Sequence, residues 1–251
     1  MLRERVVFGP VKSRRLGSSL GINLLPEEGK LCNFDCIYCE CGWNADGTSD
    51  RRIPTRTQVR TALEDKLSEC MLEGVQIDSI TFSGDGEPTL NPEFPGIVED
   101  TLHLRDAFYP DSKVSVLSNA TMLHVSEIVE ALRRVDNPIL KLDAPTTALA
   151  HIINRPAEGY NVEKVLTGME AFGGDFVLQT MMLKAPGFDS SSPEVLGPWK
   201  DIVRRLRPRE IMVYTIARPA PMDGLEKFSA EQMRQLVQPL LDEGFKIQIT
   251  A

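Results

Sequence analysis

Residues 19–39 read SLGINLLPEEGKLCNFDCIYC, a largely apolar run followed by a loop that carries three cysteines. The run 19–25 has the length of a strand. Cys32, Cys36 and Cys39 follow it with the spacing C-x3-C-x2-C. Three thiolates on one short loop can hold three corners of an iron-sulfur cube, because soft sulfur ligands suit iron-sulfur clusters and zinc. The stretch therefore predicts a strand whose C-terminal turn binds a metal centre, with the fourth iron of a cube left open.

Outside this stretch, short runs rich in β-branched residues alternate with longer segments whose apolar residues recur at helical spacing. This alternation is typical of repeated strand-helix units around a parallel sheet. It predicts an α/β fold, a partial (β/α)6 barrel with outer helices. With 251 residues and 42% hydrophobic content, the chain can bury one sizeable core, so we expect a single domain over residues 1–251.

The expected elements follow from this periodicity. Val59, Leu63, Leu67 and Cys70 lie one helical turn apart, which predicts a core-facing helix that ends near Gly74. Further helices are predicted at 92–108, 124–135, 161–172, 193–206 and 230–243, the last opened by a capping-box spacing. Strands are predicted at 19–25, 79–83, 113–118, 139–143, 176–183 and 210–216, with an edge strand at 245–249.

Charge and composition narrow the classes of partner. The formal net charge of -8 gives no overall attraction to phosphate backbones, which disfavours nucleic acid, although Lys12, Arg14 and Arg15 form a local basic cluster. No apolar stretch has the length that a bilayer requires, and the N-terminal residues lack the apolar core of a signal peptide. We therefore expect a cytoplasmic protein that does not associate with a membrane.

The five cysteines point to metal binding or catalysis. Four of them lie between Cys32 and Cys41, too close together for a disulfide framework. Two alternatives use Cys41 as a fourth ligand: a structural zinc site, or a closed cluster in an electron carrier. Cys70 lies on the apolar stripe of a helix, which favours a small buried hydrophobe.

Polar residues follow the later strands. Gly84 and Gly86 flank Asp85 after the second strand, where glycines allow a ligand to approach the backbone, although Asp-Gly is also an ordinary turn. Ser118 and Asn119 end the third strand, where they either bind a ligand or cap a turn. A ligand is expected at these turns, because parallel α/β folds gather their chemistry at the C-terminal ends of strands.

Charged residues on the fourth strand allow two interpretations. Lys141 and Asp143 share one face of an otherwise apolar run, where charges are costly unless they are paired or face a cavity. They form either a structural salt bridge or a contact with a cofactor or substrate. Arg155, in a following loop, either binds a carboxylate or is a surface residue. Gln179, Thr215 and Arg218 are further candidates on the substrate side.

At the three cysteines, with Tyr38 placed before the last of them, the chain resembles the radical S-adenosylmethionine (radical SAM) superfamily. The resemblance implies a 4Fe-4S cluster on Cys32, Cys36 and Cys39 whose open iron binds the methionine end of S-adenosylmethionine. It implies that one electron from the cluster splits the sulfonium and gives a 5'-deoxyadenosyl radical, which abstracts hydrogen from a substrate. It also implies an electron donor such as flavodoxin or ferredoxin.

The resemblance assigns further residues to S-adenosylmethionine. Gly84, Gly86 and Glu87 match the glycine-glutamate motif that holds the methionine amino group, and Ser118 and Asn119 stand where the family places contacts to the ribose. Tyr38, Asp143 and Arg155 complete the expected cofactor contacts.

Several stretches, among them Ile153-Asn154-Arg155-Pro156 and Thr215-Ile216-Ala217-Arg218-Pro219, look like the iron-sulfur oxidoreductase branch grouped with wyosine-synthesis enzymes. Those tRNA enzymes carry a second cluster on cysteines upstream of the signature, and this sequence has no cysteine before Cys32. With the acidic charge, this departure favours a protein, peptide or small-molecule substrate. Modification of tRNA is the alternative within the superfamily, and the expected substrate is unidentified.

Overall fold

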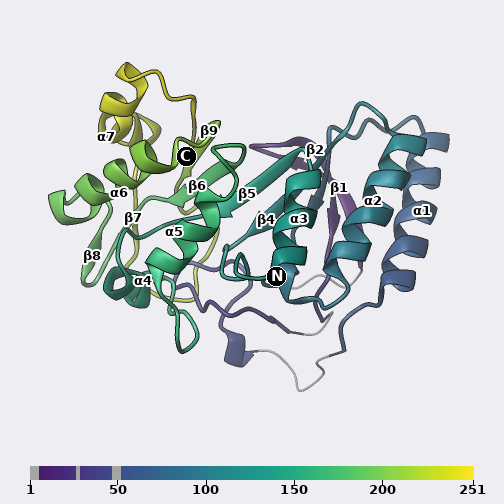
Figure 1. The fold of residues 1–251 in the computed structure, drawn as a ribbon, viewed down its shortest axis with the longest axis horizontal. Helices are drawn as coiled ribbons and strands as arrows, with labels where there is room; N and C mark the ends of the chain where they lie inside the picture. The colour runs from purple at the N-terminus through teal and green to yellow at the C-terminus, as the bar shows by residue number, and fades with distance from the viewer. Residues whose placement is uncertain (1–5, 27–28, 47–51) are drawn as a thin grey trace. The chain divides into compact units, whose positions relative to one another are not determined.

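A computed structural model describes residues 6–26, 29–46 and 52–251 of the chain (Figure 1). The chain divides into two compact units. Unit 1 comprises Met1–Cys32, Asn44–Ser118 and Val125–Pro138, and unit 2 comprises Asn33–Trp43, Asn119–His124 and Ile139–Ala251. The chain therefore passes from one unit to the other inside the cysteine loop and again after residue 118. The expectation of one domain stays a prediction.

The strands of unit 1 form a sheet in chain order. β1 (Val7–Ser13) pairs antiparallel with β2 (Gly17–Ile22), which pairs in parallel with β3 (Ser79–Phe82), and β3 pairs in parallel with β4 (Lys113–Ser118). The sequence-based prediction missed β1 and placed the next strand at 19–25. Gly21 pairs with Phe8, and the Phe8 ring occupies the space that a side chain at Gly21 would need. A glycine inside the strand thus marks the place where the missed strand packs.

Three helices of unit 1 lie side by side in Figure 1: α1 (Arg56–Leu72), α2 (Phe94–Phe108) and α3 (Ser126–Arg134). α1 begins at a capping box formed by Thr55 and Gln58, and its buried residues are the four that the apolar spacing predicted. The chain turns away after Gly74, whose φ is +67°. Short 3-10 turns lie at Asn44–Asp46 (η1) and Pro88–Leu90 (η2).

Unit 2 is built on parallel strands in the order β5 (Asn137–Lys141), β6 (Val177–Met181), β9 (Glu210–Tyr214) and β11 (Ile247–Thr250). Its helices are α4 (Thr147–Ile153), α5 (Val162–Glu170), α6 (Pro193–Leu206) and α7 (Ala230–Asp242). A small antiparallel sheet joins β10 (Glu226–Lys227), β7 (Leu183–Ala185) and β8 (Phe188–Asp189).

The two faces of the unit 2 sheet differ in chemistry. One face is aliphatic and buried, with Leu178, Ile211 and Val213 on it, and α6 packs there through the indole of Trp199, which donates to Thr180 Oγ1 at 3.1 Å. On the other face four residues lie in one row across the register: Lys141, Gln179, Met212 and Gln248. We call this row the polar face. Alternation along parallel strands places these residues opposite the helix-covered core.

The predicted α/β class, with parallel strands and covering helices, is confirmed in both units. The main errors lie in the short elements: α4, β7, β8 and β10 were not predicted, and the strand expected at 210–216 ends at Tyr214. α7 continues past Pro239. No helix among the described residues is long and apolar enough to cross a membrane. The cytoplasmic location stays a prediction.

Candidate functional site

The start of the cysteine loop is bonded to the glycine turn after β3. Leu31 N donates to Asp85 O at 2.9 Å, and Glu87 N donates to Leu31 O at 3.1 Å. Between them Gly86, with φ of +144°, lies so near that a Cβ on it would collide with the Leu31 carbonyl. Gly86 is therefore required by the approach of the loop backbone. The residue that precedes Cys32 is held at the turn.

The middle of the cysteine loop is bonded to the last residue of α4 and the residues that follow it. Asp35 N donates to Asn154 O at 2.8 Å, and Ile37 N donates to Ile153 O at 3.0 Å. A third backbone bond joins the same two segments, since Ala157 N donates to Asn33 O at 2.8 Å. These backbone bonds fix the loop without using any cysteine side chain.

The three cysteines differ in exposure. Cys36 is buried, whereas Cys32 and Cys39 are half-buried, as is Cys41. Burial raises the pKa of the Cys36 thiol to about 11, so the metal-free thiol is protonated near neutral pH and must lose its proton when it becomes a ligand. Cys70 is buried on α1, as predicted.

No three cysteine, histidine or acidic side chains of the described residues gather around one metal position. An iron-sulfur cube does not need such a group, because its cysteine ligands sit on different irons. The loop offers four soft thiols, three of them with the C-x3-C-x2-C spacing, which suits iron-sulfur chemistry. On donor chemistry and anchoring, the loop fits a 4Fe-4S cluster.

A buried polar network in unit 2 centres on Asp143. Tyr38 Oη and Asn154 Nδ2 both donate to Asp143 Oδ2, the second at 2.7 Å. Met181 N donates to Asp143 Oδ1 at 2.8 Å, and Lys141 Nζ lies 3.5 Å from Oδ2. Each carboxyl oxygen of Asp143 thus has a protein partner. The salt-bridge interpretation of Lys141 and Asp143 describes these contacts, and contact of Asp143 with a cofactor stays a prediction.

Lys141 links this network to the polar face. Its Nζ donates to Tyr38 Oη at 3.1 Å and to Tyr214 Oη at 2.8 Å. Burial opposes the charged form, but Asp143, Tyr214 and Cys36 together outweigh it and raise the pKa of Lys141 above its usual range. Burial, reinforced by Asp143, raises the pKa of Tyr38 well above its usual value. Near neutral pH the network therefore holds a charged ammonium and a neutral phenol.

Glu87 and Ser118, predicted on different turns, are brought together in unit 1. Ser118 Oγ donates to Glu87 Oε1 at 2.9 Å, and Thr89 N donates to the same oxygen at 3.2 Å. Both predicted residues are buried. Gly84 lies against the side chain of Asn23, which occupies the space where a Cβ would stand. Both glycines of the turn are thus packed against other residues of unit 1.

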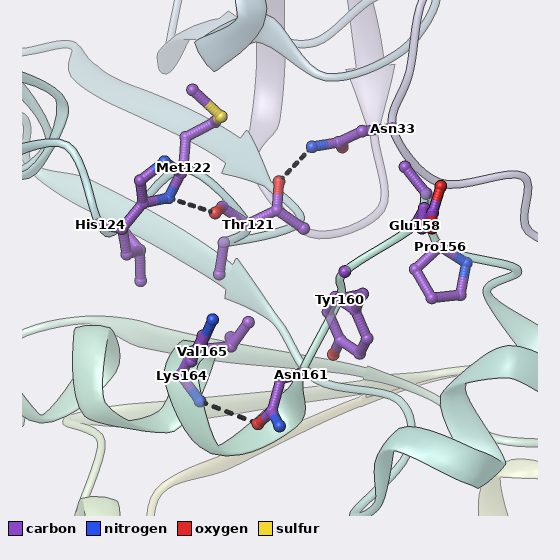
Figure 2. Close-up of a pocket in the computed structure, with 14 residues that line it drawn as sticks. Asn33, Thr121, Met122, His124, Pro156, Glu158, Tyr160, Asn161, Lys164 and Val165 are labelled. Carbon is purple, nitrogen blue, oxygen red and sulfur yellow. Dashed lines mark hydrogen bonds between the residues drawn. The ribbon is translucent and has the colours of Figure 1, made fainter.

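Asn119 is bonded to two residues that line a pocket in unit 2. Asn119 Nδ2 donates to Asn33 Oδ1 at 2.6 Å, and Asn119 Oδ1 accepts from Thr121 N at 3.1 Å. Asn33 and Thr121 line a pocket of about 520 Å³, and Figure 2 shows their side chains bonded to each other, with Tyr160 also on its wall. This volume lies within the range of small-molecule sites. Sequence reasoning missed Asn33, Thr121 and Tyr160; only the position of Asn33 inside the cysteine loop pointed to it.

Three other predicted residues lie outside these groups. Arg155 has a φ of +44° and its guanidinium stands 4.7 Å from the centre of the Trp43 ring, a cation-π contact. Thr215 Oγ1 donates to Met182 O at 2.9 Å. Arg218 pairs with Glu40 at 2.6 Å. Their described contacts are with the protein, and contacts with a ligand stay predictions.

Gln179 is the remaining substrate-side candidate. It is 5% exposed on the polar face, and its Nε2 has no hydrogen-bond partner among the described residues. A buried donor without a partner costs about 1–3 kcal/mol. Such a group is uncommon in a native protein and calls for an explanation.

The radical SAM superfamily model matches residues 29–187. UPF0026 protein slr1464 of Synechocystis sp. is 32% identical over 222 residues, which cover 86% of this chain and 77% of that protein. UPF0026 protein MJ1312 of Methanocaldococcus jannaschii is 31% identical over 85% of this chain. This chain spans 64% of the length of the Methanocaldococcus protein. The match of the superfamily model covers the cysteine loop, the glycine turn and the Asp143 network.

Two solved structures are similar in fold. A radical SAM methyltransferase from Sphaerobacter thermophilus superposes with a TM-score of 0.69 over 92% of this chain and 65% of its own, at 14% identity. TYW1 with a lysine-pyruvate adduct bound has a TM-score of 0.64 over 92% of this chain and 76% of its own, also at 14% identity. At these identities the likeness is one of fold, and it supports the predicted fold type.

Proposed function

This chain belongs to the radical SAM superfamily, and we propose that it cleaves S-adenosylmethionine reductively and abstracts hydrogen from a substrate. Membership makes the protein an S-adenosylmethionine-dependent enzyme that uses a 4Fe-4S cluster. The anchored loop with Cys32, Cys36 and Cys39 carries the proposal. When bound, the cluster and S-adenosylmethionine supply the radical chemistry, and the protein supplies binding, orientation and exclusion of water.

In this proposal the three cysteines hold the cluster and leave Cys41 outside it. The backbone bonds of Leu31, Asp35 and Ile37 keep the loop in place before the cluster binds. A preformed loop lowers the entropy that the loop loses on binding. Burial of Cys36 shields at least one ligand from water.

In this proposal each unit, taken by itself, offers contacts to S-adenosylmethionine. The turn with Gly84, Gly86 and Glu87 receives the methionine amino group, with the Glu87 carboxylate as acceptor, and Ser118 supports that carboxylate through their 2.9 Å bond. Asn119 receives the ribose. The nucleoside end enters the pocket lined by Asn33 and Thr121, since Asn119 bonds directly to Asn33.

Tyr38 and Asp143, two of the predicted cofactor residues, support the cysteine loop in this proposal. Tyr38 and Asp143 bond each other inside the buried network, so we propose that they orient the last part of the cysteine loop. Arg155 stays a proposed partner for the methionine carboxylate, with Trp43 holding its guanidinium.

The substrate lies, in this proposal, against the polar face, where Gln179 offers an amide donor and Lys141 a charge. A protein, a peptide or a small molecule fits the net charge of -8 better than RNA does. The electron comes from a donor such as flavodoxin or ferredoxin. These partners are part of the proposal.

Iron and sulfide analysis of protein prepared without oxygen tests the cluster assignment. Wild type should hold one 4Fe-4S cluster, and the triple change of Cys32, Cys36 and Cys39 to Ala should hold no iron. Cys70→Ala is the matched control, because Cys70 is buried on α1, and it should keep the full cluster. Iron retained in the triple variant would overturn the assignment.

A further inference from the structure

A side-chain amide reaches the sulfur of one proposed cluster ligand. Asn154 Nδ2 lies 3.4 Å from Cys36 Sγ, within hydrogen-bonding distance for sulfur. Both residues are buried, Asn154 at 2% and Cys36 at 8% exposure. The backbones of the two segments are bonded as well, through Asp35 N to Asn154 O. The contact between amide and sulfur is therefore part of a fixed arrangement.

The neighbours of Asn154 decide which edge of its amide faces the sulfur. Asp143 Oδ2 accepts from Asn154 Nδ2 at 2.7 Å and also from Tyr38 Oη. If the amide were turned over, its oxygen would face a carboxyl oxygen that already accepts hydrogen bonds, with no hydrogen between the two. Asp143 thus keeps the NH2 group on the side of the sulfur, and the second hydrogen of that group is shared between Tyr38 Oη at 3.2 Å and Cys36 Sγ at 3.4 Å.

We propose that Asn154 is a positioning residue that raises the reduction potential of the cluster by donating a hydrogen bond to the Cys36 sulfur, with Asp143 fixing the direction of its amide. Reduction adds one electron to the cluster and makes its sulfurs more negative. A donor aimed at a ligand sulfur stabilises that reduced state more than the oxidised one. The hydrogen bond therefore makes the electron easier to deliver.

The test measures the midpoint potential of the cluster by redox titration, followed by EPR of the reduced form. Asn154→Leu and Asn154→Asp both remove the N–H donor and keep the number of side-chain heavy atoms. Each should keep its iron and show a potential more negative than wild type. Asn137→Leu is the matched control, since the Asn137 amide donates to Ser115 Oγ at 3.1 Å, and it should titrate at the wild-type potential.

The inference rests on the cluster of the proposed function. Failure of the inference can be distinguished from failure of the proposed function. Iron and sulfide content reports whether the cluster is present, whereas the potential reports the action of Asn154. An Asn154 variant that holds a full cluster at the wild-type potential would overturn the inference and leave the proposed function standing.

A measurement on wild type decides the question if neither variant keeps its cluster. Protein grown with asparagine labelled with ¹⁵N at the side-chain amide is reduced and studied by pulsed EPR. The inference predicts a nitrogen coupling to the reduced cluster. Absence of any coupling from labelled asparagine in fully loaded wild type would contradict it.

Discussion

Gly86 and Leu31 lie in direct backbone contact, one in the turn after β3 and the other immediately before the first cysteine of the loop. The bonds on either side, from Leu31 N to Asp85 O and from Glu87 N to Leu31 O, make a short parallel bridge. These two bonds therefore hold the start of the loop predicted to bind the cluster against the turn predicted to bind the methionine end of S-adenosylmethionine. A substitution in the turn should therefore affect the start of the cysteine loop, and a substitution at the start of the loop should affect the turn.

Gly86→Ala should lower both stability and iron content, because the new Cβ would collide with the Leu31 carbonyl. Gly74→Ala is the control: Gly74 also has a positive φ, of +67°, but nothing lies within 4 Å of its Cβ position. The control should lose about 1 kcal/mol and keep its iron. Thermal unfolding and iron analysis of the two variants check this, and equal behaviour would show that the Leu31 contact is unimportant.

Ala157→Trp should fill the pocket beside Asn33 and weaken S-adenosylmethionine binding. Ala157 is exposed and lines the pocket, so a large side chain there need not disturb the core. Ala107→Trp, on the exposed side of α2, is the control. Calorimetric titration of the cluster-loaded proteins should give an affinity at least tenfold lower for the first variant only. If Ala157→Trp bound S-adenosylmethionine with wild-type affinity, the assignment of the nucleoside to this pocket would be wrong.

Gln179→Leu should raise the free energy of unfolding by about 1 kcal/mol, because it removes a buried donor that has no described partner. The adjacent Thr180→Val should have the opposite effect. Thr180 Oγ1 donates to Leu142 O at 2.8 Å and accepts from the Trp199 indole at 3.1 Å, and both partners would lose a bond. Thermal unfolding of both variants checks the contrast. A marked loss of stability in Gln179→Leu would mean that the amide serves the fold.

Asp100→Asn should make stability less dependent on pH. Hydrogen bonds from Arg56, at 2.7 and 2.8 Å, hold the pKa of Asp100 below its ordinary value of 3.8. A carboxyl group with a lowered pKa stabilises the fold above its unfolded pKa, and this contribution is lost as pH falls through the folded pKa. Wild type should exceed the variant by about 2 kcal/mol at pH 7, with the gap narrowing below pH 3.8. Calorimetry of both proteins at pH 7 and pH 3 measures the gap, and a constant gap would contradict this account.

The sequence predicted the long elements and the metal-binding loop because their signals are local. The stripe of Val59 and Leu67 needs only helical periodicity, and it reappears as the buried side of α1. β1 was missed because Val7–Ser13 lacks regular alternation and depends on the fit of Phe8 over Gly21. α4 is only seven residues long, and periodicity cannot identify so short a helix.

The same distinction between local sequence signals and tertiary contacts applies to the site residues. The cysteines were found from their spacing and the glycine turn from its place after a strand, whereas the resemblance pointed to Glu87 and Ser118 on two separate turns, which the structure joins. The link from Asn154 to Cys36 spans 118 positions of sequence. Such a contact depends on tertiary structure alone, so no spacing rule could have predicted it.

Cleavage of S-adenosylmethionine by the reduced protein tests the central claim most directly. Fully iron-loaded wild type and Cys41→Ala are reduced with dithionite, and 5'-deoxyadenosine is measured by chromatography. Three cysteine ligands leave one iron open, so both proteins should form 5'-deoxyadenosine and methionine, slowly without substrate. Loaded and reduced wild type that yields no 5'-deoxyadenosine, while Cys41→Ala gains activity, would contradict the claim, because Cys41 would then be the fourth ligand of a closed cluster.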